Sequence, residues 1–289
     1  MKPTYVLDPA APPPIGWDVY AEHANAEWQS LLRSAPPEAA FQYFLERHPG
    51  FLPGADGLRL ANRNSYDDVV FTQPALPGIQ TRIPDFLFFL TNSADFVPVF
   101  IELEHPSKKW FTSKRIPTSD LIQALGQVAE WKAWLESPAN RDNFFDLYVW
   151  STQLKQRSFK PCFLLIYGSG EEFEGKPDLS KLRGQWESSD TSLMTFKRLR
   201  LSQTFSRSLT VRYRAARLSL VSVPPTFKIG AFSAETFLRI DELGEVFEQM
   251  ELVTAERRAF LRGRVEYWRA WARRIREGEM FMVAGPDSE

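Results

Sequence analysis

The chain has 289 residues and a formal net charge of −1, and 44% of its residues are hydrophobic. This length suits one large domain, or one domain with extensions, and the apolar fraction allows a substantial core. The near-neutral charge excludes a generally basic protein, so any binding of nucleic acid must depend on local patches. The single cysteine, Cys162, excludes a disulfide framework and a cysteine-based zinc site.

No apolar stretch approaches the roughly 20 residues that a membrane-spanning helix needs. The first residues also lack the apolar segment of a signal peptide, so we expect a cytoplasmic protein without a membrane anchor. Cys162 lies inside the apolar run of residues 162–167, which predicts a buried structural thiol.

The N-terminal part of the chain predicts two helices and a strand. Residues 1–36 are rich in proline and show little periodicity, which indicates an extended arm with one helix around Glu22–Leu32. A second helix is predicted over residues 37–47, because three apolar residues form a stripe and Pro49 ends the pattern. The stripe of this helix consists of Phe41, Phe44 and Leu45. A strand is predicted at residues 69–71.

Residues 86–90 and 97–104 predict two strands joined by a polar turn. Asp85 opens the first run, and Glu102 and Glu104 close the second. If the strands fold back about the Ser93–Ala94 bond, Asp85 lies directly opposite Glu102. Opposed residues of an antiparallel pair project to the same face, with Cβ atoms about 5 Å apart. Glu104, two residues further on, lies on that face as well.

Three acids on one face would repel one another, so this arrangement calls for a cation. Mg²⁺ is the natural candidate, with Mn²⁺ as the alternative, because Mg²⁺ takes oxygen ligands and usually keeps several waters. The sequence therefore predicts a metal site formed by Asp85, Glu102 and Glu104. A simpler interpretation stays open for each: Asp85 as a turn residue after proline, and the two glutamates as the solvated face of an edge strand.

A polar, basic connection follows the second strand, close to the predicted metal site. Contact with phosphate and simple solvation explain its cations about equally well. These cations are Lys108, Lys109, Lys114 and Arg115.

A helix is then predicted from Thr118 or Ser119 to about Leu135, since Thr and Ser favour the N-cap position. Helical spacing predicts one side of this helix as its core stripe and places other residues on a different side. The core stripe is Leu121, Leu125, Val128 and Leu135. The other side carries Gln123, Gln127, Trp131 and Trp134.

Two more strands are predicted near residues 145–150 and 163–167, and further strand over residues 209–232, broken at Pro224-Pro225. The order of helices and strands predicts an α/β fold with a mixed central sheet.

A helix over residues 255–277 carries many arginines and a narrow apolar seam of coiled-coil type. We expect it to be a surface helix docked through this seam, or a subunit interface, rather than a direct DNA contact. The seam consists of Leu261, Val265, Trp268, Ala272 and Ile275.

Pro84-Asp85, then Glu102-x-Glu104, then a helix carrying Gln127 resembles the PD-(D/E)xK nuclease pattern. Longer segments resemble the Shedu family of this superfamily, over roughly residues 37–232. They are residues 38–52 (EAAFQYFLERHPGFL), 82–89 (RIPDFLFF), 100–111 (FIELEHPSKKWF) and 124–135 (ALGQVAEWKAWL). Later segments similar in order and spacing are residues 163–168, 194–199 and 222–227.

Shedu proteins are antiphage defence nucleases, and the resemblance implies the same role here. It implies a restriction-endonuclease-like core over residues 37–232, with a mixed central sheet flanked by helices. Residues 1–36 then form an N-terminal arm and residues 233–289 a C-terminal helical extension. The implied activity is Mg²⁺-dependent hydrolysis of DNA, in which the metal activates water and offsets charge on the phosphate. We expect a homo-oligomer that responds to a phage-derived trigger.

The chain departs from the superfamily pattern at Glu104, which stands where a lysine normally orients or activates the attacking water. Three interpretations follow. The second carboxylate replaces the lysine, as in some restriction enzymes; or Lys108 or Lys109 reaches back from the following loop; or the site is catalytically weak. In the last case the chain would be a non-catalytic nucleic-acid-binding or sensor protein on the same fold.

Three further residues are candidates for the site. The resemblance implies that Gln127 lies near the metal and the substrate backbone, although a surface glutamine on a helix is ordinary. Glu38 could supply a fourth acid or simply favour the start of its helix through the helix dipole. His105 could hydrogen-bond a phosphate, but a loop histidine without a special role is the preferred interpretation.

Overall fold

The computed structural model describes residues 5–58, 60, 62–78, 83–214, 217–230, 234–241, 243–276 and 289. Its strands are β1 (Asn64–Thr72), β2 (Phe86–Thr91), β3 (Asp95–Leu103), β4 (Ser158–Phe159), β5 (Cys162–Ile166), β6 (Thr191–Met194), β7 (Leu209–Arg214) and β8 (Arg217–Ser222). They form one mixed sheet in the order β6-β5-β3-β2-β1-β7-β8, with β4 paired to β3. This confirms the predicted α/β class with a mixed central sheet.

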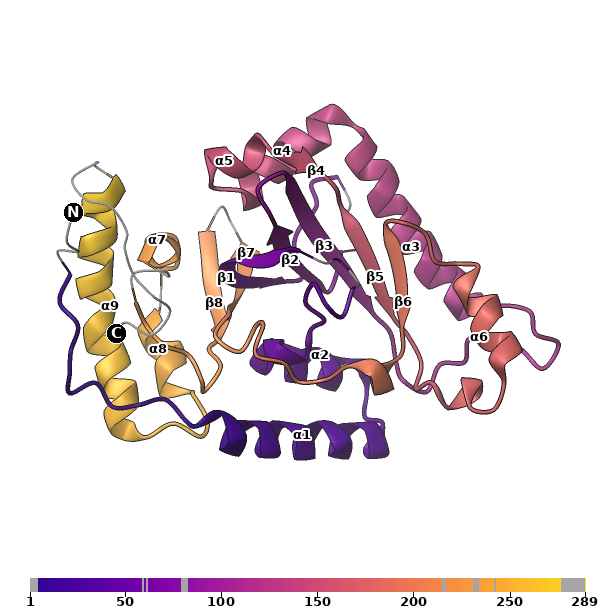
Figure 1. Cartoon of the computed structure of the whole chain (residues 1–289), viewed down its shortest axis with the longest axis horizontal. Coiled ribbons are helices and arrows are strands. Elements are labelled where there is room, and N and C mark those ends of the chain that lie inside the picture. Colours follow the sequence, from indigo (N-terminus) through magenta and orange to yellow (C-terminus); the bar gives the residue numbers. More distant parts are fainter. Residues whose placement is uncertain are drawn as a thin grey trace.

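The helices are α1 (Trp17–Ser34), α2 (Glu38–Arg47), α3 (Ser119–Glu136), α4 (Pro138–Tyr148), α5 (Thr152–Lys155), α6 (Pro177–Gly184), α7 (Ala234–Phe237), α8 (Leu243–Glu248) and α9 (Ala255–Arg276). Short 3-10 helices are η1 (Pro49–Phe51), η2 (Glu171–Phe173) and η3 (Phe196–Arg198). Helices α1 and α2 lie on one side of the sheet and α3 and α4 on the other, while α9 stands beside α7 and α8 (Figure 1). The predicted helix around Glu22–Leu32 is thus the longer α1.

Strands β2 and β3 form the predicted hairpin. Phe86 pairs with Ile101, which is the register that a fold back about the Ser93–Ala94 bond predicts. In the turn, the Asn92 side chain accepts hydrogen bonds from the N–H groups two and three residues later, at 2.9 and 2.7 Å. An asparagine that bonds its own following backbone in this way is typical of a turn.

Alternation along β2 determines which side chains face which layer of helices. Phe86, Phe88 and Leu90 pack in the core shared with α1 and α2. Leu87 and Phe89 pack in the core shared with α3 and α4. Because successive side chains of a strand point to opposite faces, Asp85 belongs on the α3 side.

Strand β5 lies beside β3 and is buried along its whole length. Its parallel pairing places Leu165 next to Glu102, so β3 is an interior strand of the sheet. The interpretation of Glu102 and Glu104 as the solvated face of an edge strand is therefore wrong. Cys162, the first residue of β5, is buried as predicted, and burial raises the pKa of its thiol to about 11.

Helix α3 begins where the sequence predicts, since Thr118 Oγ1 accepts a hydrogen bond from the N–H of Leu121 at 3.3 Å. The prediction that Trp131 and Trp134 lie away from the core stripe is wrong. Their exposed fractions are 0% and 8%, and both pack in the same core as Val128. The apolar face of α3 is thus wider than a narrow stripe.

The strand predicted over residues 145–150 is also wrong, because α4 occupies most of this segment. Pro138 stands in the first turn of α4, where its missing N–H removes no intrahelical bond. Phe144 and Tyr148 are both buried, and their spacing of four residues puts them on one face of the helix. A run of aromatic residues is typical of a strand as well as of a buried helix face.

Helix α9 docks on the rest of the chain through its predicted apolar seam, whose members Leu261, Val265, Trp268 and Ala272 are buried. The Trp268 ring centroid lies 5.5 Å from that of Tyr5. This confirms the expectation of a docked helix. The predicted last residue, Glu277, and the side chain of Ile275 lie outside the described residues. Within the described part of the chain, no helix combines the length and apolarity that crossing a membrane requires.

Candidate functional site

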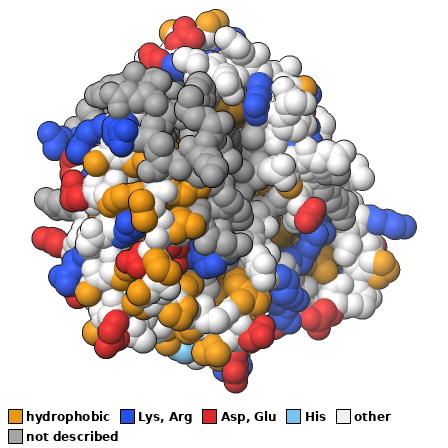
Figure 2. Space-filling view, turned by 60° about the vertical axis from the view of Figure 1, so that its left-hand side comes forward, with side chains coloured by type: hydrophobic (Ala, Val, Ile, Leu, Met, Phe, Trp, Pro, Cys, Tyr) orange, Lys and Arg blue, Asp and Glu red, His pale blue; other side chains and the backbone are white. Residues whose placement is uncertain are grey.

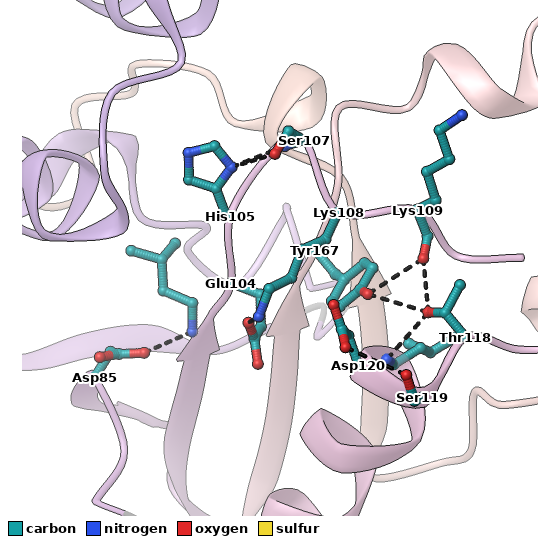
Figure 3. A network of polar contacts seen from close by, with 12 residues as sticks. Asp85, Glu104, His105, Ser107, Lys108, Lys109, Thr118, Ser119, Asp120 and Tyr167 are labelled. Atoms are coloured by element: carbon teal, nitrogen blue, oxygen red, sulfur yellow. Dashed lines mark hydrogen bonds and ion pairs between the residues drawn. The ribbon is translucent and has the colours of Figure 1, made fainter.

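Asp85 and Glu102 lie at the end of the β2–β3 hairpin. Asp85 immediately precedes β2, and the pairing of Phe86 with Ile101 places it across from Glu102. The Asp85 N–H donates to the Ile101 carbonyl at 2.9 Å. Its Oδ2 accepts a hydrogen bond from the N–H of Leu103 at 2.7 Å (Figure 3). The Asp85 carboxylate is therefore fixed against the neighbouring strand.

Both carboxyl groups resist ionisation. Burial raises the pKa of Asp85 to about 8, and the carboxylates of Glu38 and Glu104 contribute to the same shift. Glu102 is 6% exposed, and burial, followed by the charges of Asp85 and Glu104, raises its pKa to about 10. The ionised form of both acids is therefore disfavoured, because the site withdraws them from water and places them beside other carboxylates.

One oxygen of Glu102, Oε2, is buried and has no hydrogen-bond partner among the described residues. A buried polar atom without a partner costs about 1–3 kcal/mol of stability. A hydrogen bond from Gln127 on α3 opposes the rise in the pKa of Glu102, so Gln127 lies against this carboxyl group. A divalent cation takes carboxylate oxygens as ligands. Such an ion would supply a partner for Oε2 of Glu102 and would offset the charge of both acids when they are ionised.

The three predicted ligands do not surround one point in this structure. Among the described residues, no three Asp, Glu, His or Cys side chains form a group that could hold a metal ion. Asp85 and Glu102 form a pair, whereas Oε2 of Glu104 is bound by the ammonium group of Lys108. Two acids are thus available as ligands, and the third belongs to an ion pair.

Lys108, and not Lys109, reaches back to the acidic residues. The Lys108 ammonium lies against Glu104, while the Lys109 side chain points away from it (Figure 3). Burial lowers the pKa of Lys108, but the hydrogen bond and charge of Glu104 outweigh this effect, so the pKa is raised. Lys109 is exposed, and its ammonium has no ion-pair partner in the part of the chain that is described.

Glu38 and His105 lie beside the same acids. Burial and the charge of Glu104 raise the pKa of Glu38, in the first turn of α2. The His105 Nε2 bonds the Pro36 carbonyl at 2.8 Å, and Nδ1 contacts Ser107 Oγ at 2.6 Å. Both ring nitrogens are thus engaged within the chain, and His105 ties the loop after β3 to the residues that precede α2.

Glu172, which belongs to none of the predicted site residues, holds the loop that carries Lys108 through its carboxylate. It accepts hydrogen bonds from the N–H groups of Trp110 and Phe111, at 2.8 and 2.9 Å. The contact joins residues about sixty positions apart, so no local pattern predicts it. The only sequence signal is the turn after β5, where Gly168 and Gly170 precede the acid.

Comparison with known proteins assigns the chain to a family. Residues 35–199 match the family model described as Shedu protein SduA, C-terminal. This match covers more than half of the 289 residues and includes every residue of the acidic site. No curated protein matches the sequence significantly. The chain therefore belongs to the Shedu family, through the region that corresponds to the C-terminal part of SduA.

Proposed function

We propose that this protein is a metal-dependent endonuclease that cleaves DNA in antiphage defence, on a PD-(D/E)xK core. Membership of the Shedu family supports the defence role. The observation that carries the nuclease proposal is the pair of carboxyl groups formed by half-buried Asp85 and buried Glu102, with one Glu102 oxygen unpartnered. Apolar side chains would stabilise this position better than two acids withdrawn from water, so the acids fit a role in binding a cation.

Asp85 and Glu102 would hold Mg²⁺ or Mn²⁺ through their carboxylate oxygens. Such an ion acts as a Lewis acid, which offsets charge on the phosphate and makes water a stronger nucleophile. The hydrogen bond from Gln127 orients the Glu102 carboxyl group. The Leu103 N–H donates a hydrogen bond to Oδ2 of Asp85. This bond satisfies one lone pair of the carboxylate and fixes the direction in which Oδ1 points.

Lys108 supplies the ammonium group that the superfamily pattern places two residues after the second acid. In this chain that position is Glu104, and the Lys108 ammonium contacts it. An ammonium group held there can donate hydrogen bonds to a water molecule or to a phosphate oxygen next to the acidic pair. Glu104 therefore acts as the partner that keeps Lys108 at the site.

A groove of about 930 Å³ extends from Lys108, between the loop of residues 106–118 and the segment of residues 169–179. Two acids also line it, and one of them, Glu172, has both carboxylate oxygens bonded to backbone N–H groups. A phosphodiester backbone suits the cations of this groove, since each phosphate contact releases bound counterions. Those cations are Lys108, Lys109, Arg115 and Lys176.

Three arginines of α9 are engaged within the chain. Arg257 is buried, and Arg262 pairs with Glu248. Arg269 donates a hydrogen bond to the Phe237 carbonyl at 3.0 Å. Figure 2, with the α9 side of the molecule turned forward, shows basic and acidic side chains interspersed among hydrophobic ones. The groove beside Lys108 is therefore the preferred surface for DNA.

The proposal is tested by incubating the purified chain with supercoiled and linear DNA in Mg²⁺, Mn²⁺ or EDTA. The parent should cleave only with metal, and Glu102→Gln should lose cleavage and Mn²⁺ binding measured by calorimetry. Glu136→Gln, an exposed acid at the end of α3, is the matched control and should behave like the parent. Equal cleavage and equal Mn²⁺ binding by Glu102→Gln would rule out the metal site.

A second candidate function is a non-catalytic nucleic-acid sensor. The observation that favours it is the ion pair between Glu104 and Lys108. Among the described residues, Lys108 carries the only ammonium group that bonds an acid of this site, and Glu104 is that acid. A parent protein that binds DNA but never cuts it, with any metal and with extract from infected cells, would support this function.

A further inference from the structure

The backbone of residues 108–111 is held on several sides by side chains distant in the sequence. The N–H groups of Trp110 and Phe111 donate to the two carboxylate oxygens of Glu172, at 2.8 and 2.9 Å. The carbonyl of Lys109 accepts hydrogen bonds from Thr118 Oγ1 at 2.8 Å and Tyr167 OH at 3.2 Å. Consecutive peptide groups after Lys108 are thus fixed to the N-cap residue of α3, to the residue that follows β5 and to η2.

The close approach of this loop to β5 depends on a glycine. Gly168 has a φ of +64°, and a Cβ atom there would lie 2.8 Å from the Lys108 carbonyl oxygen. The same Cβ would lie 2.7 Å from Nε1 of Trp110, a side chain that is 1% exposed. Trp110 in turn packs edge-on against Phe173 of η2, with ring centroids 5.5 Å apart. The loop and the segment after β5 therefore form one tightly packed unit.

Glu172 differs from its acidic neighbours in what it binds. Glu174 is exposed and forms an ion pair with Lys197 at 3.2 Å, a contact between two flexible side chains. Glu172 is only partly exposed, and both of its oxygens accept from backbone N–H groups. Hydrogen bonds to an ionised acceptor are about twice as strong as neutral ones, so this carboxylate holds the loop more firmly than an amide could.

We propose that Glu172 is a positioning residue for the nuclease reaction, which acts by fixing the loop so that Lys108 stays at Glu104. The proposal rests on the nuclease function proposed above. Lys108 carries a long, flexible side chain, and placing its ammonium in one position costs conformational entropy. Fixing the backbone immediately after Lys108 removes part of that cost before substrate binds.

Glu172→Gln tests this role, because the amide nitrogen cannot accept a hydrogen bond and one backbone N–H loses its partner. We expect kcat to fall by about 10- to 100-fold, as when a group that orients a reacting side chain is lost. The KM for DNA should change little, since Lys109 and Lys176 still line the groove. Glu174→Gln is the matched control and should keep parental kinetics.

A double-mutant cycle separates positioning from general destabilisation. If Glu172 acts through Lys108, adding Glu172→Gln to Lys108→Ala should lower kcat no further. Additive losses in the cycle would overturn the proposal, as would a parental kcat for Glu172→Gln. Near-ultraviolet circular dichroism and thermal unfolding check that each variant is folded.

A second measurement needs no catalysis and so separates this inference from the nuclease proposal. Acetic anhydride labels accessible lysine amines, and mass spectrometry compares the labelling rates of Lys108 and Lys109. In the parent, Lys108 should react more slowly because its ammonium is engaged by Glu104. In Glu172→Gln the Lys108 rate should approach that of Lys109. An unchanged, slow Lys108 rate in that variant would overturn the positioning role, whether or not the parent cleaves DNA.

Discussion

Asp85 and Glu102 should make the stability of the metal-free protein fall as pH rises. Their pKa values of about 8 and about 10 lie far above the ordinary range of carboxyl groups, near 4. At a pH between the ordinary pKa near 4 and the raised pKa of each group, the folded protein retains a proton that the unfolded chain has released. Ionisation therefore favours the unfolded chain, and stability is lost as pH rises from about 4 towards the folded-state pKa values, by at most about 1.4 kcal/mol per pH unit for each group.

Glu102→Gln removes one of these titrations and should gain stability relative to the parent as pH rises from 5 to 8. Urea unfolding in EDTA at several pH values measures the effect, with Glu136→Gln as the control. Added Mn²⁺ should stabilise the parent and leave Glu102→Gln unchanged, because only the parent keeps both ligands. Parallel curves of stability against pH for parent and Glu102→Gln would show that folding does not raise the pKa of Glu102.

Lys108 and Lys109 are adjacent in the sequence but should differ in what they contribute. Lys108→Ala removes the ammonium bonded to Glu104 and should lower kcat strongly. Lys109→Ala removes an exposed groove cation and should mainly weaken DNA binding, reducing the slope of log K against log salt by about 0.9 for one phosphate contact. Lys155→Ala, on α5 and outside the groove, is the control. Equal kinetic effects of the two substitutions would contradict these separate roles.

The start of α3 links helix stability to the site. Thr118 Oγ1 caps the helix at Leu121 and also donates to the Lys109 carbonyl at 2.8 Å. Thr118→Ala should cost about 1 kcal/mol from the lost cap. Because it also releases the loop, it should lower cleavage more than this change in stability explains. Ser119→Ala, at an exposed first-turn position, is the control for both readouts.

How far the sequence predicts an element depends on how local its determinants are. The β2–β3 register was predictable because a polar turn separates two apolar runs and the period of a strand is fixed. The face shared by Asp85 and Glu102 follows from that register alone. Lys108 was one of two candidates, since both lysines lie within reach of Glu104. The structure, in which this loop packs against Gly168 and Glu172, has Lys108 as the lysine that contacts Glu104.

The errors have physical causes as well. The aromatic residues at 144–150 fit a strand by propensity, yet Phe144 and Tyr148 also fit one face of a helix. A core stripe of aliphatic residues alone predicts Trp131 and Trp134 on another side of α3. Their burial widens the face that α3 presents to the sheet. Long-range contacts, and not local propensity, decide both cases.

The C-terminal helices share a core with the sheet that carries the site. Phe71 and Leu87 of the sheet, Phe237 of α7 and Trp268 of α9 belong to one continuous group of buried side chains. Strand β7 also pairs in parallel with β1, from Val69↔Leu209 onward. The family match ends at residue 199, before both of these contacts.

The predicted domain boundary at residue 232 should therefore not separate two independently folding units. A chain truncated after residue 232 loses α7–α9 and exposes the apolar side chains they cover, so it should be aggregation-prone or melt well below the full chain. Trp268→Ala in the full chain should cost about 3–5 kcal/mol and lower the temperature of a single cooperative transition. Calorimetry of parent and variant checks this expectation. Two separate transitions in the parent, with only one of them shifted by Trp268→Ala, would instead show that the C-terminal helices form a domain of their own, and residues 1–232 would then be the unit in which to study the acidic site.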